Sequence, residues 1–227
     1  MPPASQHDNA TLGIFFIVLG MTAITINDML IKLLSGGYPL HEMVFVRSVI
    51  GICFSLSLVQ LEGGFKILRT DKPWLHLSRG LLLVVSNLSF FAALAVLPLA
   101  DATAIFFVAP LFITLLSILM LGEKVGFRRI SAVLVGFAGV IVVQQPWSSQ
   151  EPEIANRLVL LLPVLAAFTY ALCQILTRRL GVSSKASAMA VYIHGTFIVV
   201  SAGFWVIAGD GRFAAGIEDP SLQFLFR

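Results

Sequence analysis

The chain has 227 residues, of which 58% are hydrophobic and only 12% are charged. A soluble domain carries about 25% charged residues and cannot hide so much apolar surface, so the composition excludes an ordinary soluble protein. The net charge of +3 is spread in twos and threes between apolar blocks and forms no basic run, which argues against nucleic-acid binding.

Apolar blocks follow one another along nearly the whole chain, and each has about the roughly 20 residues that a helix needs to cross a bilayer. They must be helices, because a backbone in lipid has to satisfy its own hydrogen bonds. The predicted fold is therefore an all-α integral membrane bundle. Seven spans are expected, in chain order Thr11 to Ile31, Glu42 to Leu61, Trp74 to Leu97, Ala100 to Leu121, Phe127 to Gln145, Leu158 to Leu176 and Ala186 to Ala208.

Residues 1–10 are predicted to be a cytoplasmic tail. They contain no Lys or Arg, so the charged leader of a secretory signal is missing and the first span should be retained. The fifth predicted span has the shortest uninterrupted apolar core, Ile130 to Val143, and needs Arg128 and Arg129 to snorkel toward the headgroups.

The basic residues of the loops predict the orientation, because Lys and Arg near span ends tend to stay in the cytoplasm. The second, fourth and sixth loops hold nine of them, namely Lys66, Arg69, Lys72, Lys124, Arg128, Arg129, Arg178, Arg179 and Lys185. The other loops hold three, namely Lys32, Arg157 and Arg212. The amino terminus is therefore expected on the cytoplasmic side of the inner or plasma membrane.

A faint internal repeat relates the two parts of the chain. A shift of 146 residues lays Leu12–Leu34 on Leu158–Leu180, and Lys32 then meets Arg178 at the helix end. Because five helices separate the two copies, matching helices enter the membrane from opposite faces. That is the inverted repeat of many carriers.

Short patterns in the first five spans point to a known family. They are Ile31-Lys32, Phe45-Val46-Arg47-Ser48, Arg79-Gly80, the stretch Ala92 to Ala102 with Pro98 inside it, Pro110, Leu121-Gly122-Glu123-Lys124, and Gly136 with Gly139. With these patterns, the sequence from about Ile14 to Val143 resembles the EamA family of the drug/metabolite transporter superfamily.

The resemblance implies a ten-helix carrier built from two inverted five-helix repeats. On this basis residues 11–145 form the first repeat, 146–157 a linker, and 158–227 a partial second repeat of two helices and the start of a third at Ser221–Phe226. Two interpretations remain open. The favoured one is a truncated copy of a longer carrier, and the other is a short form completed by a homodimer or a second membrane chain.

Polar groups at membrane depth are the candidate site residues, because a central charge costs about 2.5–3.5 kcal/mol. Arg47 and Arg79 each lie about five residues inside a helix, roughly 7 Å below the interface at 1.5 Å per residue. By the predicted topology they sit toward opposite faces, which suits substrate binding or gating by a carboxylate-binding guanidinium. Snorkelling is the alternative explanation for both.

Other polar residues extend the candidate set. Asn87 is the deepest strong polar group of the third span, and it either bonds between helices or faces an aqueous cavity. Asn27, Tyr170 and Gln174 are further candidates for substrate or gate contact. For ion or proton coupling, the candidates are Asp28 and His194.

Each of the two coupling candidates has a structural alternative. Asp28 can form an i,i+4 ion pair with Lys32, and His194 can be a satisfied interhelical histidine. The prolines 110 and 163 are expected to kink their helices. Ala132, Gly136 and Gly139 form a small-residue face that would allow close helix contact.

The sequence contains no phosphate-binding glycine loop, no metal-ligand cluster and no nucleophile with a base, so an enzyme is not expected and no cofactor is predicted. The leading hypothesis is a secondary carrier that moves a small polar metabolite or drug by alternating access. The alternative is a non-transporting fragment or a membrane scaffold that needs a partner chain. In either case the lipid bilayer is the surrounding medium.

Cysteine-labelling tags test the predicted orientation. Tags placed in the loops of Lys66 and Arg128 are both expected to react only from the cytoplasmic side, because both loops belong to the basic set. Impermeant thiol reagents on intact cells and on inverted vesicles make the measurement. A tag that reacts from outside intact cells contradicts the topology.

Overall fold

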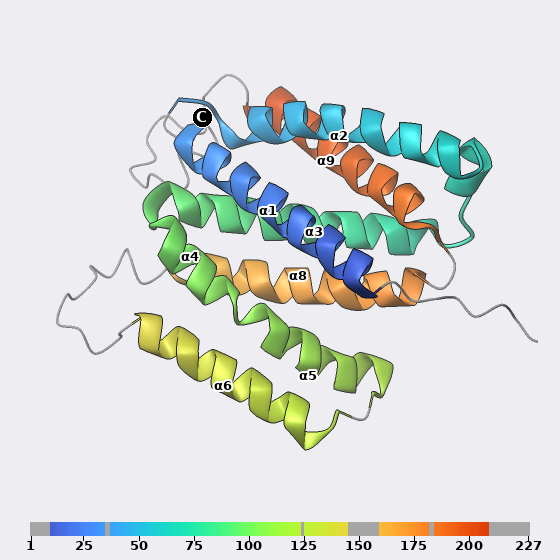
Figure 1. Ribbon diagram of the computed structural model, residues 1–227. Coiled ribbons are helices and arrows are strands. Elements are labelled where there is room, and N and C mark those ends of the chain that lie inside the picture. Colours follow the sequence, from blue (N-terminus) through green and yellow to red (C-terminus); the bar gives the residue numbers. More distant parts are fainter. Residues whose placement is uncertain (1–9, 35–36, 124, 145–158, 182–183, 209–227) are drawn as a thin grey trace, which may run out of the picture.

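The computed structural model describes residues 10–34, 37–123, 125–144, 159–181 and 184–208. These residues form helices joined by short links, with no strand in the described part of the chain, which confirms the predicted all-α bundle (Figure 1). The elements are α1 (Ala10–Leu34), α2 (Leu40–Glu62), the 3-10 helix η1 (Phe65–Leu68), α3 (Pro73–Val96), α4 (Leu99–Phe106), α5 (Ala109–Leu121), α6 (Phe127–Gln144), α8 (Leu161–Leu180) and α9 (Ala186–Ala208).

Three of the predicted features lie outside the part of the chain that the structure describes. The linker at 146–157, the tail up to residue 9 and the start of a further helix at Ser221–Phe226 lie outside the described residues.

Six helical segments of the described chain are long and apolar enough to cross a membrane: α1, α2, α3, the α4–α5 pair, α8 and α9. The fifth predicted span, α6, is not among them: within the described residues only Ile130–Gly139 counts as an apolar helix, which is too short to cross a membrane. The prediction of seven full spans is therefore one too high. Arg128 at one end and Gln144 at the other leave too short an apolar stretch for the hydrocarbon layer.

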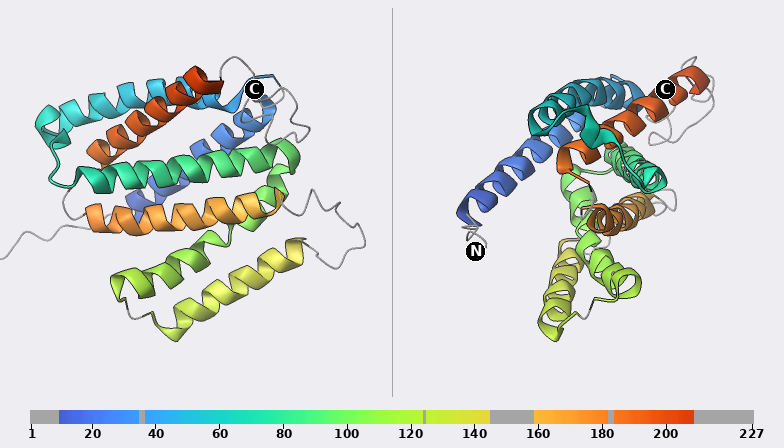
Figure 2. Two further views of the ribbon diagram at one scale, coloured as in Figure 1. Left: turned by 180° about the vertical axis from the view of Figure 1, so that it is seen from behind. Right: turned by 90° about the vertical axis from the view of Figure 1, so that its right-hand side faces the viewer.

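The helix α3 stands at the centre of the bundle. On one side α9 packs against both α2 and α3, and on the other side α8 packs against α3, α4 and α5. In Figures 1 and 2 the α2–α9 pair therefore lies along one edge and α6 along the other, with α3 and α8 between them. The first helix contacts α3 and extends away from the other helices, as the right-hand view of Figure 2 shows.

The outer surface of the bundle is apolar. Nearly every side chain of α1 is exposed, from Leu12 to Leu34, although most of them are hydrophobic. The hydroxyls of Thr22 and Thr25 donate to backbone carbonyls one turn earlier in the same helix, at 2.9 and 3.0 Å. These hydroxyls need no water, so this surface suits lipid.

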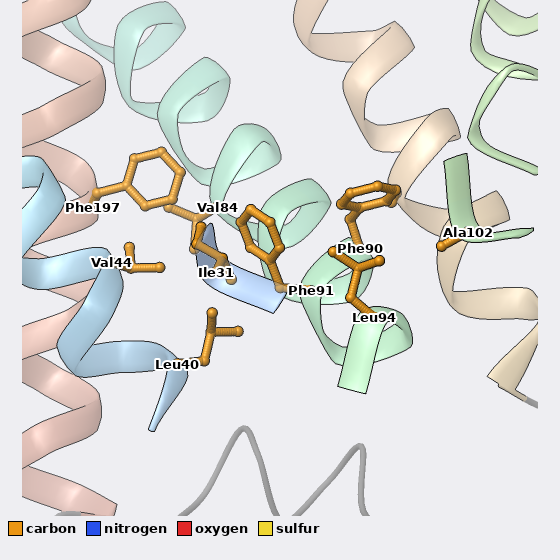
Figure 3. Packing of buried hydrophobic residues seen from close by; sticks show 10 residues of the cluster. Ile31, Leu40, Val44, Val84, Phe90, Phe91, Leu94, Ala102 and Phe197 are labelled. Carbon is orange, nitrogen blue, oxygen red and sulfur yellow. The ribbon is translucent and has the colours of Figure 1, made fainter. Parts of the chain in front are cut away.

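The main core cluster lies between α1, α2, α3 and α9 and reaches α4 and α8. Side chains from α1, α2, α3 and α9 converge in it, and Figure 3 shows Phe91 and Phe197 reaching into the same region beside Ile31 and Val44. Ala102 of α4 and Ala166 of α8 extend the cluster toward the opposite edge. Packing around α3 therefore holds four helices together at the level where the polar candidates lie.

Pro110 breaks the fourth span, as predicted. The helix stops at Phe106 and restarts at Ala109, because a proline has no N–H for the carbonyl four residues earlier. Pro163, in contrast, lies in the first turn of α8, which begins at Leu161. Val159 is helical and Leu160 forms a turn just before this helix, and the residues before Val159 lie outside the described part of the chain, so the kink at Pro163 stays a prediction.

The small-residue face of α6 does not make the close contact that was predicted. A methyl group built on Gly136 or Gly139 meets nothing within 4 Å. Both glycines line a crevice of about 720 Å³ between α6 and the α4–α5 pair, together with Ala132 and Pro110. The loose packing arises because small side chains face one another from both walls, with Ala100 and Ala104 opposite.

A glycine of α3 allows the close approach of α9. A methyl group built on Gly80 would lie 2.9 Å from Cβ and 3.1 Å from Cγ2 of Thr196. Because Cβ is fixed to the backbone, Gly80→Ala must push the helices apart, at about 1–3 kcal/mol of stability. Thermal unfolding in detergent, followed by circular dichroism, should show a lower midpoint for Gly80→Ala and no change for Gly139→Ala. Equal midpoints would contradict the close packing.

Candidate functional site

Arg47 of α2 is enclosed by groups from two other helices. Its guanidinium lies over the ring of Phe91 in α3, at 5.8 Å from the centroid, and over the ring of Phe197 in α9, at 5.6 Å. Its Nη2 donates to Oδ1 of Asn87 at 3.3 Å. A cation held over aromatic faces gains about 2 kcal/mol when it is desolvated, so the rings offset part of the cost of the buried charge.

Three further predicted residues lie near this guanidinium. The negative charge of Asp28 and the positive charge of Arg47 attract each other. The charge of Arg47 also acts on His194. Asn27 donates from its amide nitrogen to Oδ1 of Asp28 at 3.1 Å. Five candidates from α1, α2, α3 and α9 thus lie in one region, and we call them the Arg47 cluster: Arg47, Asn87, Asp28, Asn27 and His194.

Lys32 fastens α1 to α3 near this cluster. Its ammonium donates to the backbone carbonyls of Leu94 and Leu97, the second at 3.1 Å, at the end of α3. Both carbonyls belong to the last turn, where the helix leaves its C=O groups without helical partners. The predicted ion pair between Lys32 and Asp28 stays a prediction.

Arg79 forms a separate centre on the same helix. It is 8% exposed, its Nε donates to Oγ1 of Thr177 in α8 at 2.6 Å, and its Nη1 donates to the Met189 carbonyl in α9 at 3.3 Å. Arg79 and Asn87 are eight residues apart, or about 12 Å along α3. The structure therefore does not bring the two predicted arginines together.

Polar contacts join the helices at the end of the bundle that carries the second, fourth and sixth loops, which we call the even-loop end. Glu62 at the end of α2 accepts from Ser187 of α9 at 2.7 Å, and its carbonyl accepts from Lys185 at 2.8 Å. Arg178 of α8 pairs with Glu123 at 3.2 Å. With Arg79, these contacts hold α2, α3, α5, α8 and α9 together at this end.

An aromatic row leads from the Arg47 cluster to the last pair of candidates. Phe91 contacts Phe90, Phe90 contacts Phe106, and Phe106 contacts Tyr170, with ring centroids 5.8, 5.3 and 5.5 Å apart. Gln174 then donates to the Tyr170 hydroxyl at 2.5 Å. Tyr170 and Gln174 thus form a polar pair on α8, at the far end of the row and beside the break in the fourth span.

A crevice opens beside the Arg47 cluster, at the end of the bundle opposite the even-loop end. It holds about 550 Å³ between the start of α2 and the end of α9, and its walls include His41, Glu42 and Trp205. Val46, which precedes Arg47, and Ser201, one turn beyond Phe197, also line it. Arg47 itself is not among the lining residues, and the rings of Phe91 and Phe197 lie over its guanidinium.

The chemistry of the cluster suits binding of a polar solute. A guanidinium is always charged and binds carboxylates, phosphates and carbonyl oxygens, whereas Asp28 offers an acceptor for ammonium or N–H groups. Among the described residues, no group of three or more His, Cys, Asp or Glu side chains is placed to hold a metal ion.

Comparison with known proteins places the chain in a family. The sequence matches the EamA-like transporter family over residues 11–144, which is more than half of its length. The chain belongs to the EamA-like transporter family. It is accordingly a multi-pass membrane protein of a transporter family, within the drug/metabolite transporter superfamily, and not an enzyme.

Individual relatives of this EamA-like chain are named for three solutes. The riboflavin transporter of Rhizobium johnstonii is 28% identical over 208 residues, covering 91% of this chain and 67% of the relative. The S-adenosylmethionine uptake transporter of Rickettsia bellii is 29% identical, covering 86% and 67%. The pseudopaline exporter of Pseudomonas aeruginosa is 31% identical, covering 68% and 54%. The chain thus spans about two thirds of the first two relatives and about half of the third.

The sequence did not point to several groups that complete the Arg47 cluster and the Arg79 centre. The chain has 18 phenylalanines in apolar runs, and nothing in their pattern distinguishes Phe91 and Phe197 from the lipid-facing ones. Thr177 was missed because it is 98 residues from Arg79 in the sequence. Gly51 carried a usable signal, since it lies one turn from Arg47 and leaves that face of α2 open.

The Arg79 centre makes a stability prediction. Thr177→Val keeps the shape of the side chain but removes the acceptor of Arg79 Nε, which leaves a buried charged donor unsatisfied at a cost of about 1–3 kcal/mol. Thr22→Val is the matched control, because the Thr22 hydroxyl bonds only within α1. Thermal unfolding in detergent should separate the two variants. An equal, small effect of both would show that Thr177 does not hold Arg79.

Proposed function

We propose that this chain forms the transport pathway of a secondary carrier that moves a small polar metabolite across the plasma membrane by alternating access. The observation that carries the proposal is the Arg47 cluster. A guanidinium at membrane depth, with an amide and a carboxylate nearby, is costly to bury and is explained most simply by a polar solute that it binds.

Arg47 and Asn87 are proposed to bind the solute directly. Arg47 offers donors from α2, and Asn87, whose amide also donates to the Leu83 carbonyl at 3.1 Å, offers its Oδ1 from α3. The rings of Phe91 and Phe197 now cover the guanidinium, so binding requires them to move aside or to stack on the solute. Asn27 and Asp28 reach the same point from α1, and the proposal gives Asp28 the role of ion or counter-charge partner.

Tyr170 and Gln174 are proposed as a second contact along the pathway. They lie across the aromatic row from Arg47, on α8, and Tyr170 packs beside the break between α4 and α5. Broken spans give a pathway carbonyls and N–H groups that an unbroken helix keeps for itself. A solute that contacts both ends of the row would be held by α2, α3 and α8 together.

Alternating access is supported by the uneven distribution of polar contacts. Polar contacts of α2, α3, α8 and α9, and of Glu123 just after α5, join the helices at the even-loop end, whereas the crevice between α2 and α9 opens at the other end. We assign Arg79 to the inner gate, which must release Thr177 and Met189 before solute passes. The even-loop end is proposed to face the cytoplasm, as the basic residues indicate.

The architecture proposed for the complete carrier is an inverted pair of five-helix repeats. In the part described, α1 to α6 supply the first repeat and α8 and α9 the start of the second. The relatives that this chain matches are longer, so transport by the chain alone belongs to the proposal.

Riboflavin and S-adenosylmethionine are the first solutes to test, because relatives are named for them. Both carry carbonyl or carboxylate oxygens for Arg47 and a planar ring system that can stack on phenylalanine. The pseudopaline exporter shows that relatives also work outward, so uptake and efflux are both to be measured.

Transport by the purified protein in liposomes tests the proposal. The wild-type protein should accumulate at least one of the two labelled solutes, and Arg47→Ala should lower the initial rate by about tenfold or more, since one lost charged hydrogen bond costs about 1.5–3 kcal/mol. Arg69→Ala is the control, because it removes an exposed arginine that lies outside the Arg47 cluster and the proposed gate. A rate that Arg47→Ala leaves unchanged would rule out the cluster as the transport site.

A further inference from the structure

The helix α9 passes between two glycines, one on each neighbouring helix. Gly51 of α2 faces His194, and Gly80 of α3 faces Thr196. His194 and Thr196 are two residues apart and point to different sides of α9. The helix therefore packs closely against α2 on one side and against α3 on the other. These are the two places in the described glycines where an added methyl group would meet a facing helix closer than 3 Å.

Gly51 makes space for an imidazole ring. A methyl group built on it would lie 2.7 Å from Nε2 and 2.8 Å from Nδ1 of His194, which is too close for any side chain. The Nδ1 atom is buried and has no hydrogen-bond partner among the described residues. The ring is therefore placed against α2 by shape, and no hydrogen bond at Nδ1 fixes it there.

The position of this ring is coupled to Arg47. Gly51 follows Arg47 by one turn on α2, and Phe197 follows His194 by nearly one turn on α9. The two antiparallel pairs face one another, so that His194 covers Gly51 while Phe197 covers the guanidinium at 5.6 Å. A change in how α9 sits at Gly51 would therefore also move the ring of Phe197 that covers Arg47.

We propose that Gly51 is a positioning residue of the transport site: its missing side chain lets His194 lie against α2 and sets Phe197 over Arg47. The consequence for transport rests on the function proposed for the Arg47 cluster, but the placement of the ring does not. Gly80 differs, because it faces the Cβ of Thr196, which cannot rotate away. Gly80 therefore sets the distance between α3 and α9, whereas Gly51 faces a single ring.

Nuclear magnetic resonance of the histidine rings tests the placement without any transport assay. The chain has four histidines, so the ring nitrogens of the protein labelled with 15N-histidine can be assigned with a His194→Ala variant. Gly51→Ala should shift the His194 resonances and leave those of His76 in place, because the added methyl displaces one ring. Gly203→Ala, on the same helix but away from His194, is the matched control, since a methyl group there meets nothing within 4 Å.

The outcomes of that experiment are distinct. A His194 shift in Gly51→Ala that is absent in Gly203→Ala supports the proposal. Unchanged His194 resonances in Gly51→Ala overturn it. Shifts of all the histidine rings together would report a general disturbance of the fold and would also overturn the specific role of Gly51.

A double-mutant cycle then tests the consequence for transport. With riboflavin or S-adenosylmethionine as the probe, whichever the wild-type protein transports, Gly51→Ala should raise KM several-fold. In a His194→Ala background the same change should leave KM unaltered, because the ring that clashes is gone. Additive effects on KM would overturn the positioning role. If neither probe is transported, the proposed function fails, while the ring resonances still decide where His194 lies.

Discussion

A charged guanidinium inside a hydrocarbon layer is the constraint around which this bundle is organised. Placing Arg47 at depth costs about 2.5–3.5 kcal/mol by membrane-insertion measurements. Two phenylalanine rings, one amide and a nearby carboxylate offset that cost, and they come from α3, α9 and α1. The helices that supply them must stay in contact for the charge to remain tolerable. The packing of α9 against both α2 and α3 meets this requirement.

The same helices carry a second charge with a different environment. Arg79 donates hydrogen bonds to α8 and α9, to a hydroxyl and a backbone carbonyl, and it lies among further polar contacts at the even-loop end. Arg47 is instead covered by rings that form no hydrogen bonds with it, next to a crevice. Rings can move aside at a lower cost than a network of hydrogen bonds can be broken. In the function we propose, this difference makes Arg47 the solute-binding group and Arg79 a residue of the inner gate.

Much of the fold could be predicted from the sequence, because apolar length and backbone hydrogen bonding leave few choices in lipid. The spans, the break at Pro110 and the family resemblance were all predicted, and the depth of Arg47 and Asn87 marked them as candidates. The count of spans was one too high, because Arg128 and Gln144 limit α6 at both ends. The small face of α6 was also misjudged, since small residues on both walls leave a crevice instead of a contact.

What could not be predicted is which distant residues meet. Thr177 reaches Arg79 and Phe197 reaches Arg47 only because α8 and α9 return to pack on α3. Sequence spacing on one helix shows which residues share a face, but it does not show the partner across an interface. The empty face at Gly51 could have indicated a close neighbour, although not that the neighbour is His194.

Water access to Asn87 tests the central claim most directly. In a chain whose two cysteines, Cys53 and Cys173, are replaced by alanine, Asn87→Cys is exposed to impermeant thiol reagents on each side of sealed vesicles in turn. A site with alternating access predicts slow labelling from both sides, whereas Ala93→Cys, which is 0% exposed in the packed core, should not react from either. An Asn87→Cys thiol that stays as unreactive as the core control would contradict the claim, because Arg47 would then serve packing alone.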